Sequence, residues 1–186
     1  LCRTSDGWPS DTYSSSDSVR GSSFKHVIWF TFNTVSSSTD NPSKFIDYDM
    51  VDQIKRDLNI ALVNELARIF PALDVDVEDV LSAAATKWNF HRYTHGVGVG
   101  GHCIPVDPYY LIQRAADVGV PAGLITAARA VNRSMPSHVA GVLSDLMWNA
   151  DVPASDAKVL LLGWSYKAEV GDPRETPAEP LAETLM

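Results

Sequence analysis

Apolar side chains recur every three or four positions along residues 47–70, and no other pattern constrains this chain as strongly. The spacing predicts an amphipathic helix of about six turns, stopped by Pro71. Its apolar stripe consists of Met50, Ile54, Leu58, Ala61, Leu62, Leu66 and Ile69. Because a bare stripe of this length is an exposed patch of the kind that monomers avoid, we expect the helix to self-associate.

Two further helices are predicted from their start signals. One has Asp76 as its N-cap. The other begins at Asp107, a capping residue followed by Pro108 at the first helical position, and Gly119 lies just beyond its end. The central part of the chain is therefore predicted to be mainly helical.

The C-terminal third combines helical patterns with a strand pattern. Prolines open two predicted helices, over residues 121–133 and 135–150. Residues 158–163 form a short continuous apolar run that is typical of a buried strand, and residues 177–186 are predicted to be helical. The sequence thus predicts the first strand and helix of an α/β domain after the helical part.

Composition divides the chain into three regions. Residues 1–45 are serine-rich and sparsely apolar, so we expect them to be poorly ordered apart from an edge strand over residues 26–32. Residues 46–150 are predicted to form a central helical domain, and residues 156–186 the start of a C-terminal domain. Both ends of the chain resemble cut ends, because it begins with leucine and stops inside a helical pattern.

Charge and cysteine content restrict the setting in which the protein works. The net charge of −8, without a basic stripe, argues against nucleic acid and anionic membranes as partners. The longest apolar runs, of about six residues, are far shorter than the roughly twenty that span a bilayer. Cys2 and Cys103 lie too far apart to suggest a disulfide framework. We therefore expect a cytoplasmic protein.

Glycine occupies four of the six positions from 96 to 101, and we call this segment the glycine loop. Gly96, Gly98 and Gly101 match the spacing G-x-G-x-x-G of dinucleotide-binding loops. That motif needs a buried strand before it and a helix that opens at its third glycine. Neither is predicted here, so we interpret the match as coincidental.

Two kinds of chemistry are open to the residues around the loop. His91, His95, His102 and Cys103 are potential metal ligands, but the loop is too flexible to make them converge, so we expect no metal site. Alternatively Cys103 is a nucleophile, helped by the backbone amides of the glycines, by His102 and by Asp107. Cys103 as a small buried apolar residue, and Asp107 as a helix cap only, remain the alternatives at this point.

Four segments carry a resemblance to a known family. "GVGVGGHCIPVDPYYL" (96–111) resembles the catalytic-cysteine signature of the UDP-glucose/GDP-mannose dehydrogenase family, in particular the branch that oxidises UDP-N-acetylhexosamines. "RDLNIALVNELA" (56–67) and "TKWNF" (86–90) are similar to the family's central helix and to the approach to its cysteine loop. "LLLGWSYKAEVGDPRETPA" (160–178) is similar to the opening of its UDP-sugar-binding C-terminal domain. The resemblance covers about residues 49–186.

The resemblance implies an activity. Members oxidise the C6 alcohol of the sugar to a carboxylate with two NAD, and the cysteine captures the intermediate aldehyde and forms a thioester. Carried over, Cys103 is the nucleophile and Asp107 helps to activate the hydrolytic water. The family also implies a homodimer through the helix over residues 47–70.

Ligand-binding residues follow from the same resemblance. Those implied for the nucleotide sugar are Gly96, Gly98, Gly100, Gly101, Tyr166 and Lys167. Those implied for NAD are His102 and Arg174. Two of these remain open from the residues alone, since Lys167 is also typical of a solvated loop and Arg174 has Asp172 and Glu175 as nearby ion-pair partners.

The sequence also departs from the family. A catalytic lysine and an asparagine are expected at positions where this chain has Asp49 and Gln53. Lys44 and Lys55 are not in register with that lysine, and replacement of the lysine in space by either of them stays open. No segment predicts the family's NAD-binding domain, so we expect the 186 residues alone not to oxidise a UDP-sugar. The chain is predicted to be part of a nucleotide-sugar dehydrogenase or, alternatively, a helical dimerisation or binding module without turnover.

Overall fold

The structure is a computed structural model that describes residues 46–186. The serine-rich segment, with Cys2, Lys44 and the strand predicted over 26–32, lies outside the described residues. The helices of the described part are α1 (Tyr48–Ile69), η2 (Phe70–Leu73), α2 (Val77–Ala84), α3 (Asp107–Asp117), α4 (Gly123–Asn149), η3 (Ala154–Asp156) and α5 (Ala178–Leu185), where η marks a short 3₁₀ helix.

Helices α1 and α2 both begin after a capping aspartate, and the cap of α2 is the predicted one. The side chain of Asp47 accepts a hydrogen bond from the backbone N–H of Met50 at 2.9 Å, which starts α1. The side chain of Asp76 accepts from Glu78 N–H at 2.7 Å and thereby caps α2. In both cases a carboxylate satisfies a backbone donor that has no partner inside the helix.

Helix α3 also occupies the predicted residues, but its cap differs. Asp107 is the first residue of the helix, Val106 is the N-cap, and no side chain makes a capping hydrogen bond. The prediction that Asp107 caps α3 is therefore wrong, and its carboxylate is not engaged by the end of the helix. Gly119, just beyond the helix, has a φ of 75°, the left-handed conformation typical of a residue that ends one.

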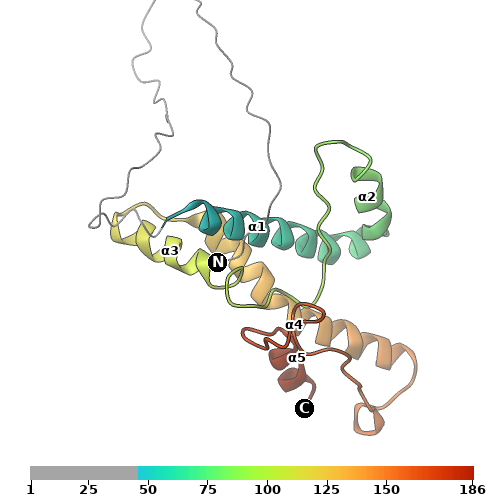
Figure 1. Cartoon of the computed structure of the whole chain (residues 1–186). Coiled ribbons are helices and arrows are strands. Elements are labelled where there is room, and N and C mark those ends of the chain that lie inside the picture. Colours follow the sequence, from blue (N-terminus) through green and yellow to red (C-terminus); the bar gives the residue numbers. More distant parts are fainter. Residues whose placement is uncertain (1–45) are drawn as a thin grey trace, which may run out of the picture. The chain divides into compact units, whose positions relative to one another are not determined.

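Helix α1 lies against α4, α3 contacts both, and α5 packs on α4 (Figure 1). A small apolar cluster lies where the glycine loop meets α1, formed by Ile60 of α1 with Val99 and Ile104. The partly buried side chains of Tyr93 and Tyr166 pack against this cluster. The loop that carries the candidate site is thus part of the core.

The two helices predicted over 121–133 and 135–150 are one helix, the 27-residue α4. Proline lacks an N–H, so Pro136 leaves the carbonyl of Asn132 without its usual partner inside the helix. The helix nevertheless continues, because Met135 and Pro136 are both buried in the packed face of α4. Tertiary packing therefore outweighs the local tendency of proline to end a helix.

The strand predicted over residues 158–163 is wrong, because the part of the chain that the structure describes contains no strand. Leu160 and Leu162 are 79% and 87% exposed, so the apolar run is not buried either. A strand is held by hydrogen bonds to a neighbouring strand. None of residues 46–186 supplies that neighbour, so only the predicted helix, α5, forms in this region.

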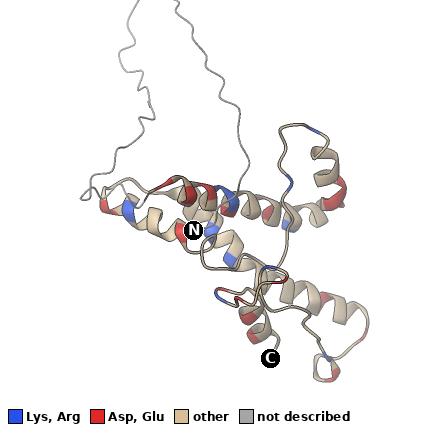
Figure 2. Ribbon diagram, viewed as in Figure 1, with Lys and Arg blue, Asp and Glu red and all other residues tan. Residues whose placement is uncertain are grey.

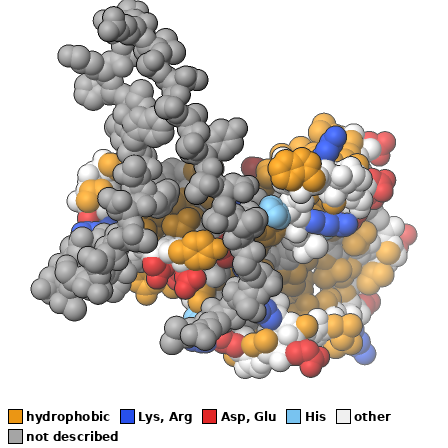
Figure 3. Space-filling model, turned by 45° about the horizontal axis from the view of Figure 1, so that its top comes forward, with side chains coloured by type: hydrophobic (Ala, Val, Ile, Leu, Met, Phe, Trp, Pro, Cys, Tyr) orange, Lys and Arg blue, Asp and Glu red, His pale blue; other side chains and the backbone are white. Residues whose placement is uncertain are grey.

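The surface of the described residues is mixed in character. Figure 2 shows lysine and arginine spread among acidic positions over the helices. Hydrophobic side chains also reach the surface in several places on the face drawn in Figure 3. Among residues 46–186, no helix is long and apolar enough to cross a membrane.

Two glycines allow the loop to pass between neighbouring segments. Gly98 has a φ of 135°, a conformation that other residues rarely adopt, and a Cβ there would lie 3.0 Å from the carbonyl oxygen of Asn132. A Cβ on Gly100 would lie 2.8 Å from the Cβ of Tyr166 and 2.9 Å from the carbonyl oxygen of Glu175. Both positions therefore require glycine for close packing.

We expect Gly100→Ala to lower the free energy of unfolding by about 1–3 kcal/mol, the usual effect of overpacking, because its new methyl group would overlap backbone atoms. Urea denaturation measures the change. The matched control is Gly141→Ala inside α4, where a Cβ meets open space and alanine favours the helix by about 0.5–1 kcal/mol. Equal effects of the two substitutions would contradict the close approach at Gly100.

Candidate active-site loop

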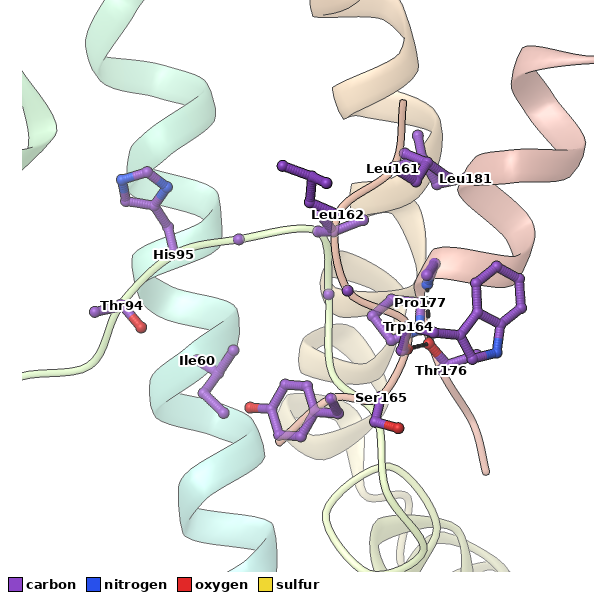
Figure 4. A pocket seen from close by; sticks show the side chains of 16 residues that line it. Ile60, Thr94, His95, Leu161, Leu162, Trp164, Ser165, Thr176, Pro177 and Leu181 are labelled. Atoms are coloured by element: carbon purple, nitrogen blue, oxygen red, sulfur yellow. Dashed lines mark hydrogen bonds between the residues drawn. The ribbon is translucent and has the colours of Figure 1, made fainter. Parts of the chain in front are cut away.

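The glycine loop forms one wall of a cavity of about 300 Å³ (Figure 4). Ile60 projects from α1 on one side, and His95 lies just before the loop. Trp164 and Ser165 lie on the opposite side, in the segment that precedes α5. The hydroxyl of Thr176 donates to the carbonyl oxygen of Trp164 at 2.5 Å, and this hydrogen bond joins the two ends of the segment that forms this wall. The cavity offers an aromatic surface and exposed backbone to a ligand.

The first glycine of the loop is held by a buried side chain of α1. The backbone N–H of Gly96 donates to the Oδ1 atom of Asn64 at 2.9 Å, and Asn64 is completely buried. The Nδ2 group of Asn64 donates in turn to Oδ1 of Asn132 in α4, also at 2.9 Å. The entry of the loop is therefore connected to both long helices.

Asn132 belongs to a buried polar network that also contains an ion pair. Its Nδ2 group donates to Oδ1 of Asp57 at 2.8 Å, and the Arg129 guanidinium donates to the same oxygen at 2.5 Å. Asp57 is 0% exposed and Arg129 5%. Burial raises the pKa of Asp57, against the opposing effects of the charge of Arg129 and the hydrogen bonds from Arg129 and Asn132.

The predicted nucleophile and the predicted base lie in one tight turn. The backbone N–H of Asp107 donates to the carbonyl oxygen of Cys103 at 2.8 Å, and Val106 N–H donates to it at 3.1 Å. Cys103 and Asp107 are both half-buried. Burial raises the pKa of Asp107, the negative charge of Asp47 raises it further, and the charge of His102 opposes the rise. The turn thus joins the backbones of Cys103 and Asp107, and the pKa of the Asp107 carboxyl group is raised.

A second segment, residues 172–176, approaches the turn, and we call it the strap. It is joined to the loop by a hydrogen bond from Gly101 N–H to the carbonyl oxygen of Arg174 at 3.0 Å. The Arg174 guanidinium holds Asp172 with two hydrogen bonds, of 2.8 and 2.6 Å. Hydrogen bonds from Arg174 lower the pKa of Asp172 to about 2. Of the two ion-pair partners that the sequence left open, Asp172 and Glu175, Arg174 therefore binds Asp172.

The strap also connects Arg174 electrostatically to Cys103. The pKa of Arg174 is raised, first by its hydrogen bond to Asp172 and the charge of that residue, and further by the charge of Cys103. The Nδ1 atom of His102 lies 3.7 Å from Asp172, on the same side of the strap. Arg174 and Cys103 therefore interact electrostatically.

The residues predicted for the nucleotide sugar do not all meet in one place. Gly96, Gly98 and Tyr166 line the 300 Å³ cavity, and burial raises the pKa of Tyr166. Lys167 is exposed. Asp107 instead lines a second cavity of about 530 Å³ between α3 and the start of α1, and Cys103 lines neither. The structure therefore gathers the loop, Tyr166 and the strap, and leaves Asp107 on a neighbouring surface.

Two of the histidines considered as metal ligands, His95 and His102, have other partners. His95 lies 3.2 Å from Glu78 of α2, through its Nε2 atom, whereas His102 faces Asp172 of the strap. Within residues 46–186, no group of three or more potential ligands is placed to hold a metal ion.

Sequence reasoning missed the network of Asp57, Asn64, Arg129 and Asn132. On α1 a signal was present, because Asp57 and Asn64 lie seven positions apart, two helical turns, and so share one face with the buried Ala61. Polar residues on the face of a helix that also carries buried apolar ones predict hydrogen-bonded partners. Their partners on α4 lie 68 to 75 positions further along the chain, and no local pattern indicates them.

Fold and site together define a helical domain that presents a cysteine from a glycine-rich loop. Residues 49–134 match the model of the UDP-glucose/GDP-mannose dehydrogenase family, central domain. The chain belongs to this family.

Curated relatives and solved structures agree with this assignment. The chain is 42% identical over 136 residues to the UDP-N-acetyl-D-glucosamine 6-dehydrogenase of Pseudomonas aeruginosa, covering 73% of this chain and 32% of that protein. It is similar to the structure of a UDP-D-ManNAc dehydrogenase from Pyrococcus horikoshii, with a TM-score of 0.67 and 36% identity over 73% of this chain and 32% of that one. An NDP-N-acetyl-D-galactosaminuronic acid dehydrogenase from Methanosarcina mazei also matches with a TM-score of 0.67, at 30% identity over 74% of this chain and 31% of that one.

The matches cover only part of each relative. The chain spans about a third of the length of the curated relatives that it matches.

We expect Asp172→Asn to accelerate alkylation of Cys103 at pH 7, because it releases Arg174 to act on the thiol. Since exposed ion pairs are weak, the change should be about 1.5- to 5-fold. Arg174→Ala should slow the reaction. Peptide mass spectrometry in a Cys2→Ser background measures both rates. Arg92→Ala, which breaks the pair with Glu78 elsewhere, is the control and should leave the rate unchanged. Equal rates in all three variants would show that Arg174 does not act on Cys103.

Proposed function

We propose that this chain forms the helical, cysteine-bearing part of a nucleotide-sugar 6-dehydrogenase, with Cys103 as the nucleophile. The observation that carries the proposal is the turn in which Cys103 and Asp107 are hydrogen-bonded, with the strap and its Arg174 beside it. A thiol with a carboxyl group and a guanidinium nearby is suited to capture a carbonyl compound and later release it.

The chemistry assigned to Cys103 is capture of the C6 aldehyde. The thiolate sulfur adds to the carbonyl carbon, a C–S bond forms, and the carbonyl electron pair moves to oxygen, which takes up a proton. The product is a thiohemiacetal, which keeps the aldehyde from diffusing away. At the thioester stage, water adds to the acyl carbon and the C–S bond breaks, releasing the carboxylate and the Cys103 thiolate.

Asp107 is proposed to assist the addition of water. Its pKa is raised by burial and by the nearby charge of Asp47, which makes the carboxylate a stronger base. The backbone hydrogen bond to Cys103 keeps the two residues together. In this proposal the Asp107 carboxylate, on the same turn as Cys103, accepts a proton from the water molecule that attacks the thioester.

NAD is the oxidant that we propose for the complete reaction, but the described residues do not fit it. The G-x-G-x-x-G match is not preceded by a strand in residues 46–186, and its glycines open no helix. Gly98 is packed against Asn132, so its backbone is not open to a pyrophosphate. Arg174 is already engaged by Asp172.

The proposed substrate is a UDP-N-acetylhexosamine. Support comes from the relatives, whose names specify N-acetyl-D-glucosamine or N-acetyl-D-mannosamine as the sugar. In this chain the glycine loop and Tyr166 line a cavity with an aromatic surface. We propose that the sugar nucleotide lies against this wall.

A second proposal concerns self-association through α1. Val51, Leu62 and Ile69 are 53%, 53% and 45% exposed, although they are large and apolar. They lie 11 and 7 positions apart, close to whole numbers of helical turns, so they share one face of α1. The face that carries Asp57 and Asn64 is used by α4 within the chain. We propose that the apolar face of α1 pairs with a second copy.

UDP-N-acetylglucosamine should slow alkylation of Cys103 in a saturable manner, because a sugar nucleotide on the glycine loop would hinder access to the thiol. The measurement is the alkylation rate in a Cys2→Ser background at increasing ligand concentration. UDP alone and N-acetylglucosamine alone are the controls and should protect less. Absence of protection at millimolar ligand would contradict the sugar-nucleotide proposal and favour a module without a substrate.

Leu62→Lys should convert a dimer into a monomer, because it places a charge in the middle of the proposed interface. Sedimentation velocity at micromolar concentration measures the change. Val120→Lys, at an exposed position outside α1, is the matched control and should remain dimeric. A parent chain that already sediments as a monomer would contradict the proposal.

A further inference from the structure

The polar network between α1 and α4 reaches the glycine loop through a single continuous path. Asp57 accepts from Asn132, Asn132 accepts from Asn64, and Asn64 accepts from the N–H of Gly96. The three side chains of this path are 0%, 2% and 0% exposed. We call Asp57, Asn132 and Asn64 the relay. No water competes for these hydrogen bonds at such burial, so each bond is strong.

All donors in the relay point the same way. Each amide uses its NH₂ group toward Asp57 and its oxygen toward the loop. Asp57 sets this direction, because a carboxylate only accepts hydrogen bonds. If either amide were reversed, Oδ1 of Asn64 would no longer face the N–H of Gly96. The carboxylate of Asp57, together with its backbone carbonyl, which also accepts from Asn132 at 3.0 Å, thus determines which atom Asn64 offers to the loop.

We propose that Asp57 is a positioning residue. Through Asn132 and Asn64 it fixes Gly96, the first residue of the glycine loop that leads to Cys103. The assignment of this loop to the substrate rests on the proposed function. The relay itself stands on the hydrogen bonds alone. Aligned hydrogen bonds polarise one another, so the carboxylate strengthens the distant bond at Gly96 as well as its own.

A role limited to joining α1 and α4 does not account for the whole path. The ion pair of Asp57 and Arg129 and the bond from Asn132 already join the two helices. The bond from Gly96 to Asn64 adds nothing to that contact, but it anchors the loop five residues before it joins the strap at Gly101. The loop is therefore held at both ends, by the relay and by the strap.

Amide hydrogen exchange of Gly96, measured by NMR on the whole chain without ligand, tests the proposal. Asp57→Asn keeps the size and an accepting oxygen but removes the charge, and should accelerate exchange at Gly96 by about tenfold, the effect of losing one net hydrogen bond. Asn64→Ala should do the same by removing the acceptor directly. Asn59→Ala is the matched control, because its side chain bonds only to Lys55 of its own helix.

Exchange at Val63, in the middle of α1, separates positioning from general destabilisation. We expect Gly96 to respond to Asp57→Asn and Asn64→Ala with Val63 unchanged. Equal acceleration at Gly96 and Val63, or no change at Gly96, would overturn the proposal. If Asp57→Asn does not fold, the exchange of Gly96 relative to Val63 in Asn64→Ala tests the proposal, because this variant leaves the Asp57–Arg129 pair in place. Loss of ligand protection at Cys103, by contrast, would contradict only the proposed function.

Discussion

The structure depends on an ion pair buried between two helices, Asp57 of α1 and Arg129 of α4. Their charges are removed from water, so the pair is favourable only with good geometry and additional hydrogen bonds. Asn132 supplies a bond to the same carboxylate oxygen, and a second one to the backbone carbonyl of Asp57 at 3.0 Å. Removing one partner of such a pair usually costs about 3–5 kcal/mol. The mutual position of α1 and α4 is therefore closely specified.

The loop takes its position from this pair of helices. Gly96 is bonded to α1 through Asn64, and Gly98 lies against the carbonyl of Asn132 that Pro136 leaves without a helical partner. Gly100 then allows the strap to approach, which places Arg174 near Cys103. The close packing of Gly98 and Gly100 thus holds the loop against α4 and against the strap. A shift of α4 along α1 would move the loop and the thiol together.

Local patterns predicted the features that depend on neighbouring residues. The cap of α2 and the approximate extents of α1 and α3 follow from residues that are close in the sequence, and they were predicted correctly. The continuation of α4 through Pro136 depends on burial by other segments, and residues 158–163 lack a neighbouring strand. The relay was missed for the same reason, since its members come from distant parts of the chain. Cys103 was identified as a candidate from its motif, and Arg174, which the resemblance assigns to NAD, pairs with Asp172, one of the two partners that the sequence left open.

Helix α1 has two faces of different character. One face holds Asp57 and Asn64 against α4, and the other exposes Val51, Leu62 and Ile69. A polar buried face is selective, because its hydrogen bonds are made only in one register, whereas an apolar face tolerates small shifts. The internal contact therefore defines where the glycine loop lies, and an external contact at the apolar face would add stability without displacing it. The position of the cysteine loop thus rests on the polar residues Asp57 and Asn64 of the buried face together with the apolar contact of Ile60 with Val99 and Ile104.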